Sequence, residues 1–257
     1  MKLRIIDLGI RNPSFNPTEA QMTRYINLEE SSAIFYTTDR EHMLIPGSRD
    51  LNKDIYIDKL PKGIGLIKGY ESISKDSRGV IYGGPNILHF SLKLRKDLLG
   101  DIDVVRTKLQ ISLIKLLKKL KVTTSNNPMY IRDNDTMILH DGKYKKISGL
   151  DWYSNNGWDV VLMLLAFKFN YELLNIVYNL KSQKMNKKGG VSDIREVILG
   201  LNEIKDNLIP KDVGLMLAKQ FAEDVGIDYY IGDFSKDEWN YLNYTQPIMD
   251  KNNWVVK

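Results

Sequence analysis

The residues best suited to chemistry lie in one segment, from Asn134 to Gly149, which reads NDTMILHDGKYKKISG. Its central Asp-Gly pair separates two runs that can form strands, so the segment is predicted to fold as a β-hairpin. Lys146 and Ser148 stand just before Gly149, which leaves backbone amides uncovered beside an ammonium group. This combination suits a bound anion, most simply a phosphate. A surface hairpin whose lysines only keep it soluble is the alternative interpretation.

Composition limits the class of protein. The chain has 257 residues, 43% of them hydrophobic and 27% charged, which is typical of a soluble globular protein with one large domain or a large domain and a small appendage. The absence of cysteine excludes disulfides, thiolate metal sites and acyl transfer through a thioester. No apolar run reaches the roughly 18 residues of a spanning helix, and the first apolar block is too short for a secretory signal. We therefore expect a cytoplasmic protein with no membrane partner.

The net charge of +5 is compatible with a nucleic acid, a nucleotide or an acidic protein as partner. Nucleic acid is the least favoured of the three, because the lysines are scattered along expected helices and are not gathered with aromatic residues. The three histidines, His42, His89 and His140, lie far apart and lack the spacing of metal ligands. Each is predicted to be a structural or surface residue.

The alternation of strand-like and helix-like segments predicts an α/β (α+β) fold. Strands are expected over residues 2–8, 33–37, 42–45, 63–68 and 158–165, and helices over residues 16–29, 103–121, 170–180 and 210–225. The strands at 33–37 and 42–45 are expected to pair with each other around the polar turn between them. A polar, lysine-rich stretch over 181–190 suggests a boundary. Residues 1–185 are expected to form the catalytic domain, and residues 186–257 a helical and aromatic extension packed on the same domain.

The hairpin segment resembles the central motif of the lipoate-protein ligase and biotin-protein ligase superfamily. In that superfamily an Asn-Asp pair, a hairpin, and a lysine followed by an apolar residue, a small residue and a glycine occur in this order. Asn134, Asp135, Lys146 and Gly149 match it. The lipoate branch is favoured because the Trp158-led strand, the helix after it and the aromatic C-terminal end are similar to that branch.

The resemblance implies a fold with mixed and antiparallel sheets flanked by helices, and it implies roles for individual residues. Lys146 would be catalytic, holding the acyl carboxylate and the α-phosphate of ATP, while Asp135 would bind Mg²⁺. The implied substrate-binding residues are Arg78, Gly79, Tyr82, Gly83, Gly84, Asn86, Asn134, Ser148 and Gly149. Two of these have alternative roles: Asn134 as a hydrogen-bonding residue at the start of the hairpin strand, and Asn86 as a turn residue.

The chain departs from the family pattern between residues 68 and 92, which read KGYESISKDSRGVIYGGPNILHFSL. It lacks the usual Arg-Arg pair and triple glycine, and Asp159 stands where the family has His after Trp. Either the loop over 72–78 rebuilds the adenylate site, with Lys75 and Arg78 supplying charge to the phosphates, or the chain is a degenerate relative that no longer binds nucleotide. Both interpretations stay open on the sequence.

The resemblance thus implies an ATP-dependent lipoate-protein ligase, or a lipoyl or octanoyl transferase, which makes an acyl-adenylate with ATP, Mg²⁺ and lipoate. Its partner would be an acceptor protein with a lipoyl domain, and a separate small accessory ligase domain is a further expected partner. A non-catalytic homologue that binds a lipoyl-domain protein, or a biotin-protein ligase, is the alternative.

Overall fold

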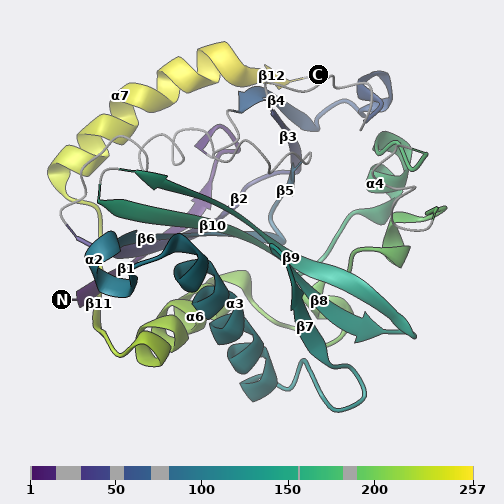
Figure 1. Cartoon of the computed structure of the whole chain (residues 1–257). Coiled ribbons are helices and arrows are strands. Elements are labelled where there is room, and N and C mark those ends of the chain that lie inside the picture. The colour runs from purple at the N-terminus through teal and green to yellow at the C-terminus, as the bar shows by residue number, and fades with distance from the viewer. Residues whose placement is uncertain are drawn as a thin grey trace.

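The computed structural model describes residues 2–15, 30–46, 55–70, 81–155, 157–181 and 190–256. The helix expected over residues 16–29 lies outside these ranges, as do Lys75, Arg78, Gly79 and the rest of residues 71–80. Among the described residues, two sheets and several helices form the body of the molecule (Figure 1).

The larger sheet is mixed and carries the hairpin at one end. Its strands are, in spatial order, β11 (Asp228–Gly232), β1 (Lys2–Arg11), β2 (Ser32–Thr38), β6 (Ile87–Arg95), β10 (Trp158–Ala166), β9 (Lys143–Asn155), β8 (Asp135–His140) and β7 (Met129–Arg132). β1 is parallel to both of its neighbours, and the pairs from β2 to β7 are antiparallel. The hairpin of β8 and β9 therefore belongs to a continuous sheet, which fixes its orientation.

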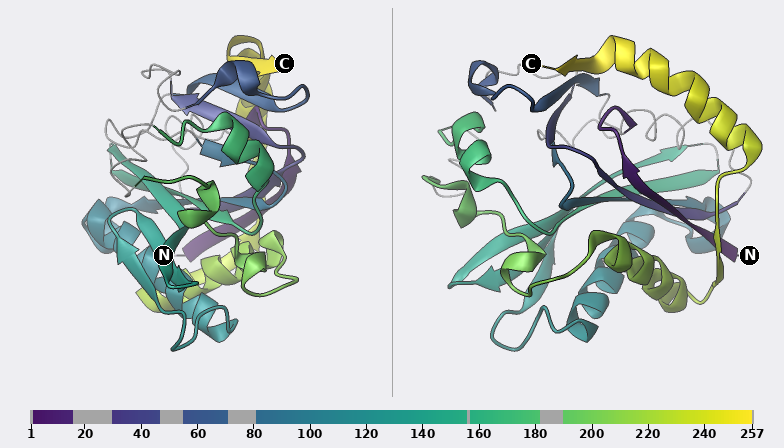
Figure 2. Two further views of the ribbon diagram at one scale, coloured as in Figure 1. Left: turned by 90° about the vertical axis from the view of Figure 1, so that its right-hand side faces the viewer. Right: turned by 180° about the vertical axis from the view of Figure 1, so that it is seen from behind.

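The smaller sheet lies on the other side of β2 and β6 from the main helices (Figures 1 and 2). Its strands are, in spatial order, β12 (Trp254–Val256), β4 (Gly65–Tyr70), β3 (His42–Pro46) and β5 (Ile81–Gly83). β5 leads through a short turn into β6 of the larger sheet. This turn joins the two sheets near the centre of the molecule.

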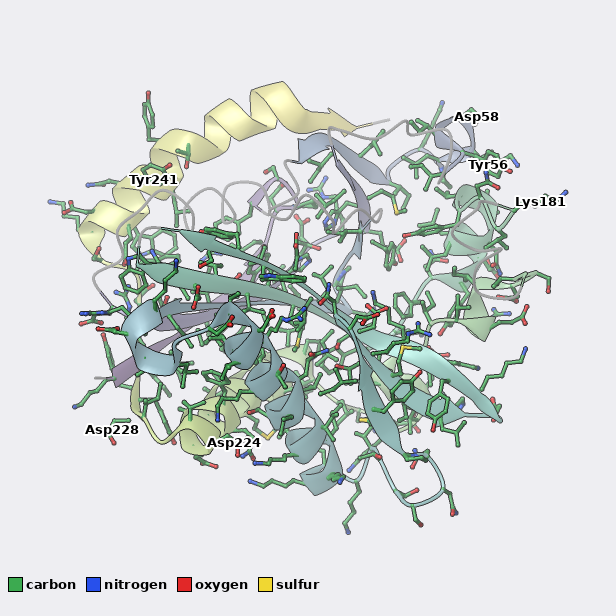
Figure 3. All side chains as sticks on the ribbon, in the orientation of Figure 1. Tyr56, Asp58, Lys181, Asp224, Asp228 and Tyr241 are labelled. Atoms are coloured by element: carbon green, nitrogen blue, oxygen red, sulfur yellow. The ribbon has the colours of Figure 1, made fainter. Side chains whose placement is uncertain are left out.

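The helices cover both faces of the larger sheet. They are α2 (Lys96–Leu99), α3 (Ile102–Lys119), α4 (Tyr171–Val177), α6 (Pro210–Val225) and α7 (Lys236–Asn253), with 3₁₀ turns η2 (Ile57–Lys59), η3 (Ile194–Glu196) and η4 (Leu201–Glu203). α3 and α6 pack on one face, where the largest core cluster includes Phe90, Leu113 and Phe221. α7 lies on the opposite side, so Asp224 on α6 and Tyr241 on α7 are far apart in Figure 3. Because α3 covers one face of the sheet, a ligand site on the hairpin is expected on the opposite face.

Local sequence explains where the two main helices start and stop. The Asp101 side chain accepts a hydrogen bond from the Asp103 amide at the start of α3, as an N-cap does. α6 begins with Pro210 in its first turn and ends at Gly226, whose φ of 74° is left-handed. The two helices are tied together where Lys115 Nζ and Ser112 Oγ each donate to the Asp224 carboxylate at 2.7 Å.

Most expected elements are confirmed with shifts of a few residues, but one pairing was wrong. The strands at 33–37 and 42–45 do not form a hairpin: β2 pairs with β1 and β6, whereas β3 pairs with β4 and β5 in the other sheet. The short polar turn between them is instead the crossing point from one sheet to the other. Tertiary pairing with strands distant in sequence overrides the local hairpin signal. The helix expected over 170–180 is also shorter, ending at Val177.

The C-terminal segment contributes directly to the larger sheet. β11 extends it beside β1, and α6 packs against β1, β2 and β6. Within the described ranges, no helix combines the length and the apolar character needed to cross a membrane.

Candidate active site

The predicted hairpin is confirmed. β8 and β9 pair from Asp135 with Gly149 to His140 with Lys143. The turn residues Asp141 and Gly142 both have positive φ, 51° and 73°, which is the backbone of a two-residue type I′ hairpin turn. Asp-Gly tolerates this conformation, so the turn chemistry sets the register of the strands that carry the candidate site.

A β-bulge at Ile147 changes how Lys146 is held. Thr136 pairs with Ser148 but the next residue, Met137, pairs with Lys146, which leaves Ile147 as the extra residue. The backbone amide of Lys146 donates to the carbonyl of Val197 at 2.8 Å, and its carbonyl accepts from the amide of Leu199 at 3.0 Å. A segment distant in sequence therefore fixes the backbone of Lys146 at the bulge.

The ammonium group of Lys146 lies directly over Gly149. A Cβ at position 149 would lie 2.6 Å from Lys146 Nζ and 2.9 Å from Cε, which is closer than real atoms approach. The same ammonium group is 2.6 Å from Oδ1 of Asp135, the cross-strand partner of Gly149. The observed position of the Lys146 ammonium group therefore depends on the glycine of the same motif.

The pair formed by Lys146 and Asp135 is only partly covered. The side chain of Lys146 is 35% exposed and that of Asp135 is 25% exposed, so an approaching ligand can reach both. The neighbouring lysines have other partners: Lys143 Nζ is 2.8 Å from Glu196 Oε2, and Lys145 Nζ is 4.0 Å from Asp141 Oδ2. Of the three hairpin lysines, Lys146 is the one placed over a glycine and against a single carboxylate.

Two of the expected site residues point to the other face of the sheet. The hydroxyl of Ser148 is buried, and among the described residues it has no hydrogen-bond partner. Asn134 Oδ1 accepts from Nη1 of Arg106 at 2.6 Å, and Arg106 lies over the Trp152 ring on the α3 side. In the main chain, the Asn134 carbonyl accepts from the Leu150 amide at 2.8 Å.

The space where a Cβ would lie at Gly83 is also filled by another side chain of the protein. A Cβ at Gly83 would lie 2.1 Å from Cε1 and 2.3 Å from Nε2 of His42, which is fully buried. At Gly84 the nearest atom to such a Cβ is Glu41 Cγ at 3.4 Å, an ordinary contact.

The hydroxyl of Tyr82 donates to Glu41 at 2.5 Å. Burial, together with this carboxylate, raises the pKa of Tyr82, which keeps the phenol protonated.

His42 belongs to a stack of three rings between the sheets. The ring of His89 lies 4.9 Å from that of Tyr36 and 6.2 Å from that of His42, nearly parallel to both. Burial lowers the pKa of His42 to about 4, opposed by a hydrogen bond to the Arg40 carbonyl. Burial, and secondly the charge of His42, lower the pKa of His89 well below its ordinary value. Both imidazoles are therefore neutral at neutral pH.

Asn86 lines a pocket of about 430 Å³ beside α4, and Lys146 is not among the residues that line it. The pocket is also lined by Phe169, Tyr171 and Arg195, and the Arg195 guanidinium lies 4.9 Å from the centre of the Tyr171 ring. The structure thus brings Lys146, Asp135 and Gly149 together, and places Tyr82, Gly83, Gly84 and Asn86 around the turn that joins the sheets.

Sequence reasoning missed the two residues that hold the backbone of Lys146. Val197 and Leu199, which hold the backbone of Lys146, carry no sequence signal, because they act through main-chain groups. His42 was predicted to be a structural or surface residue, and it is buried, but its contact with Gly83 was not predicted, although the glycines at 83 and 84 indicate that another group approaches closely there.

Comparison with known proteins shows which solved structures have a similar fold. No protein-family model matches the chain, and no curated protein does. Among solved structures, the chain is similar to a bi-partite lipoate protein ligase from Thermoplasma acidophilum, which is described with its E2 lipoyl domain. The TM-score of this comparison is 0.75 and the sequence identity is 19%. The match covers 96% of this chain and 92% of the Thermoplasma chain. The chain is similar to lipoate-protein ligase A bound with ATP at TM-score 0.72 and 18% identity, covering 96% and 95%.

A further similar structure is P. falciparum LipL1 in complex with lipoate, at TM-score 0.64 and 13% identity, covering 94% of this chain and 71% of that one. The chain therefore has the fold of lipoate-protein ligases, and the expected arrangement of mixed sheets flanked by helices is confirmed.

Proposed function

We propose that this protein is an ATP-dependent lipoate-protein ligase. It activates lipoate or octanoate as an acyl-adenylate and transfers the acyl group to a lysine of an acceptor lipoyl domain. The observation that carries the proposal is the ammonium group of Lys146, held over Gly149 by a bulge and a third backbone segment. A lysine that only kept a hairpin soluble would not need a glycine beneath it.

The reaction requires a cation at this position. A carboxylate does not acylate an amine at neutral pH, because its oxygen is a poor leaving group, and a mixed anhydride with AMP supplies a better one. Forming the anhydride brings a carboxylate oxygen against the α-phosphate of ATP, with pyrophosphate leaving. The two anions repel each other, and a fixed ammonium group in a partly dehydrated site offsets that repulsion.

Lys146 and Asp135 are arranged to exchange partners. In the structure each neutralises the other across 2.6 Å. Among the described residues no group of three metal-ligating side chains occurs, so the Asp135 carboxylate would hold a Mg²⁺ ion together with substrate phosphates and water. When bound, it would neutralise phosphate charge. Lys146 itself would pair with the acyl carboxylate and the α-phosphate.

The second step forms the amide. The amine of the acceptor lysine forms a bond to the acyl carbonyl carbon, the bond from that carbon to the AMP oxygen breaks, and AMP leaves with the electron pair. The amine loses its proton to solvent. Lys146 stabilises negative charge on the carbonyl and phosphate oxygens during both steps, which is the usual role of a fixed cation at such a centre.

The similar structures support this choice of ligands. One is described with ATP, one with lipoate, and one with an E2 lipoyl domain. The Thermoplasma protein is described as bi-partite, so the accessory domain expected from the sequence belongs in the assay as a candidate partner. Tyr82, Gly84 and Asn86 would line the adenylate side, together with Arg78 and Gly79.

The test is pyrophosphate release with ATP and Mg²⁺ and with lipoate, octanoate or biotin supplied in parallel, with and without a candidate accessory chain. We expect turnover with lipoate or octanoate and none with biotin. Turnover with biotin alone would assign the protein to biotin ligation. Tight binding of a lipoyl domain with no turnover of any acid would identify a non-catalytic relative and overturn the proposal.

A further inference from the structure

A buried imidazole nitrogen without a partner lies on the same face of the larger sheet as Lys146. Nε2 of His89 is inaccessible to solvent, and no described residue lies within hydrogen-bond distance of it. Burying an unpaired polar atom costs free energy, so native proteins rarely leave one without a reason. The whole residue is 7% exposed, so a small part of it remains accessible.

The strand register places His89 in line with the candidate site. Asp135, Gly149, Leu164 and His89 are successive cross-strand partners on β8, β9, β10 and β6. Side chains of paired residues project from the same face. Gly149 and His89 are two strand spacings apart, which is about 10 Å. An extended eight-carbon acyl chain whose carboxylate meets Lys146 has a similar length.

The surroundings of His89 suit a hydrocarbon chain better than a nucleotide. Leu164 and Ile87 belong to one apolar cluster on this face, and Tyr36 and Ile34 belong to another, so His89 stands where the two clusters meet. The ring of His89 is held between Tyr36 and His42, which fixes its orientation. An imidazole that stays neutral there adds no charge to an apolar region.

Building on the proposed function, we propose that Nε2 of His89 recognises the ring sulfur atoms at the far end of lipoate and so makes the site prefer lipoate over octanoate. Sulfur is a weak hydrogen-bond acceptor, whereas the terminal methyl of octanoate would leave the nitrogen unpaired. His89 is a specificity-determining residue in this account. It takes no part in the acyl transfer itself.

The first test compares kcat/KM for lipoate and octanoate in the full chain and in two variants. His89→Leu should lower the ratio of lipoate to octanoate about five- to tenfold, mainly through KM, because the contact is equally present before and during reaction. His89→Gln keeps an N–H donor and should recover part of the preference. His140→Gln, at a partly exposed position of the hairpin, is the matched control and should leave the ratio unchanged.

Folding is monitored in the same variants. Replacing an unpaired buried polar group by an apolar one of similar size is nearly neutral, so the thermal midpoint of His89→Leu should stay close to that of the parent. A marked fall in the midpoint, or an equal loss with both acids, would show a structural role and overturn the proposal. An unchanged ratio would overturn it as well.

A binding measurement separates this proposal from the proposed function. The chain has three histidines, so ¹⁵N-histidine signals can be assigned with one variant for each. Titration with lipoate should shift the Nε2 signal of His89, and octanoate should shift it much less. No pyrophosphate release with either acid would refute the ligase, whereas release without a lipoate-specific shift at His89 would refute only the inference drawn here.

Discussion

Gly149 and Gly83 lie at the two ends of the expected site, and at each of them another side chain of this protein occupies the place of a Cβ. Over Gly149 it is the end of Lys146, and over Gly83 it is the ring of His42. The family resemblance implied the same role for both glycines, which was to bind substrate. The structure shows that the space at each is filled before any substrate arrives.

The difference lies in what each side chain can do next. The ammonium group of Lys146 ends a flexible chain, is partly exposed and has one carboxylate partner, so it can turn toward a bound anion. The ring of His42 is fully buried, stacked in line with His89 and neutral, so it has nowhere to move. A glycine beneath a mobile cation indicates a binding site, whereas a glycine beneath a buried ring indicates packing between two sheets.

The largest effect on activity should come from Lys146→Ala. Removing the cation should cost on the order of 3 kcal/mol or more of transition-state stabilisation, a rate loss of at least about a hundredfold. The fold should stay intact, because the side chain is partly exposed. Pyrophosphate release and circular dichroism measure the two quantities. Lys143→Ala and Lys145→Ala are the controls and should be mild; similar losses from all three would mean a generic basic surface.

The largest effect on stability should come from Gly83→Ala. The new methyl group would overlap the buried His42 ring, and overpacking of this kind costs about 2–3 kcal/mol. The free energy of unfolding in urea checks it. Gly84→Ala is the matched control, since a Cβ there meets its nearest neighbour at 3.4 Å, and it should cost less than about 1 kcal/mol. Equal costs at the two positions would contradict the packing role of His42.

The neutral state of His42 predicts a pH dependence of stability. Its pKa is about 4 in the folded protein and near 6.5 when unfolded, so the unfolded chain binds more protons between these values. The free energy of unfolding should therefore fall as pH decreases below about 6.5, by about 2 kcal/mol from pH 7 to pH 5 for this residue. Urea unfolding of the parent and of His42→Asn tests it. The variant should have the shallower slope, and identical slopes would count against a buried neutral ring.

The smallest of these effects should come from Gly149→Ala. Its methyl group displaces only the end of a flexible lysine, so stability should change by less than about 0.5 kcal/mol. Activity should fall about tenfold, because the ammonium group loses its position. In the Lys146→Ala background the same substitution should cost no further activity, as expected for coupled residues. Additive losses would show that Gly149 acts independently of Lys146.

Sequence patterns predicted the elements well where the signal is local. The Asp-Gly turn, the capped helix after Asp101 and the Pro-to-Gly limits of α6 all follow from nearby residues. The assignment of β2 and β3 to different sheets could not be predicted this way, because it depends on partners that are distant in sequence. Propensity and alternation identify a strand, but they do not identify its neighbour.

The candidate site, like the fold, was predictable from the sequence only where the signal is local. Residue types identified Lys146 and Gly149, and the family resemblance added Asp135; the structure brings all three together. They did not reveal that Ser148 and Asn134 turn to the α3 side, because the bulge at Ile147 and the contact with Arg106 are not visible in a motif. Nor did they reveal His42, whose contact with Gly83 joins residues of two different strands.

The most direct test is an experimental structure of the full chain with lipoate, Mg²⁺ and a non-hydrolysable ATP analogue. The account predicts that Nζ of Lys146 stays over Gly149, leaves Asp135 and lies within hydrogen-bond distance of both the lipoate carboxylate and the α-phosphate. An unchanged pair of Lys146 and Asp135, with the ligands bound elsewhere or absent from the hairpin face, would contradict it.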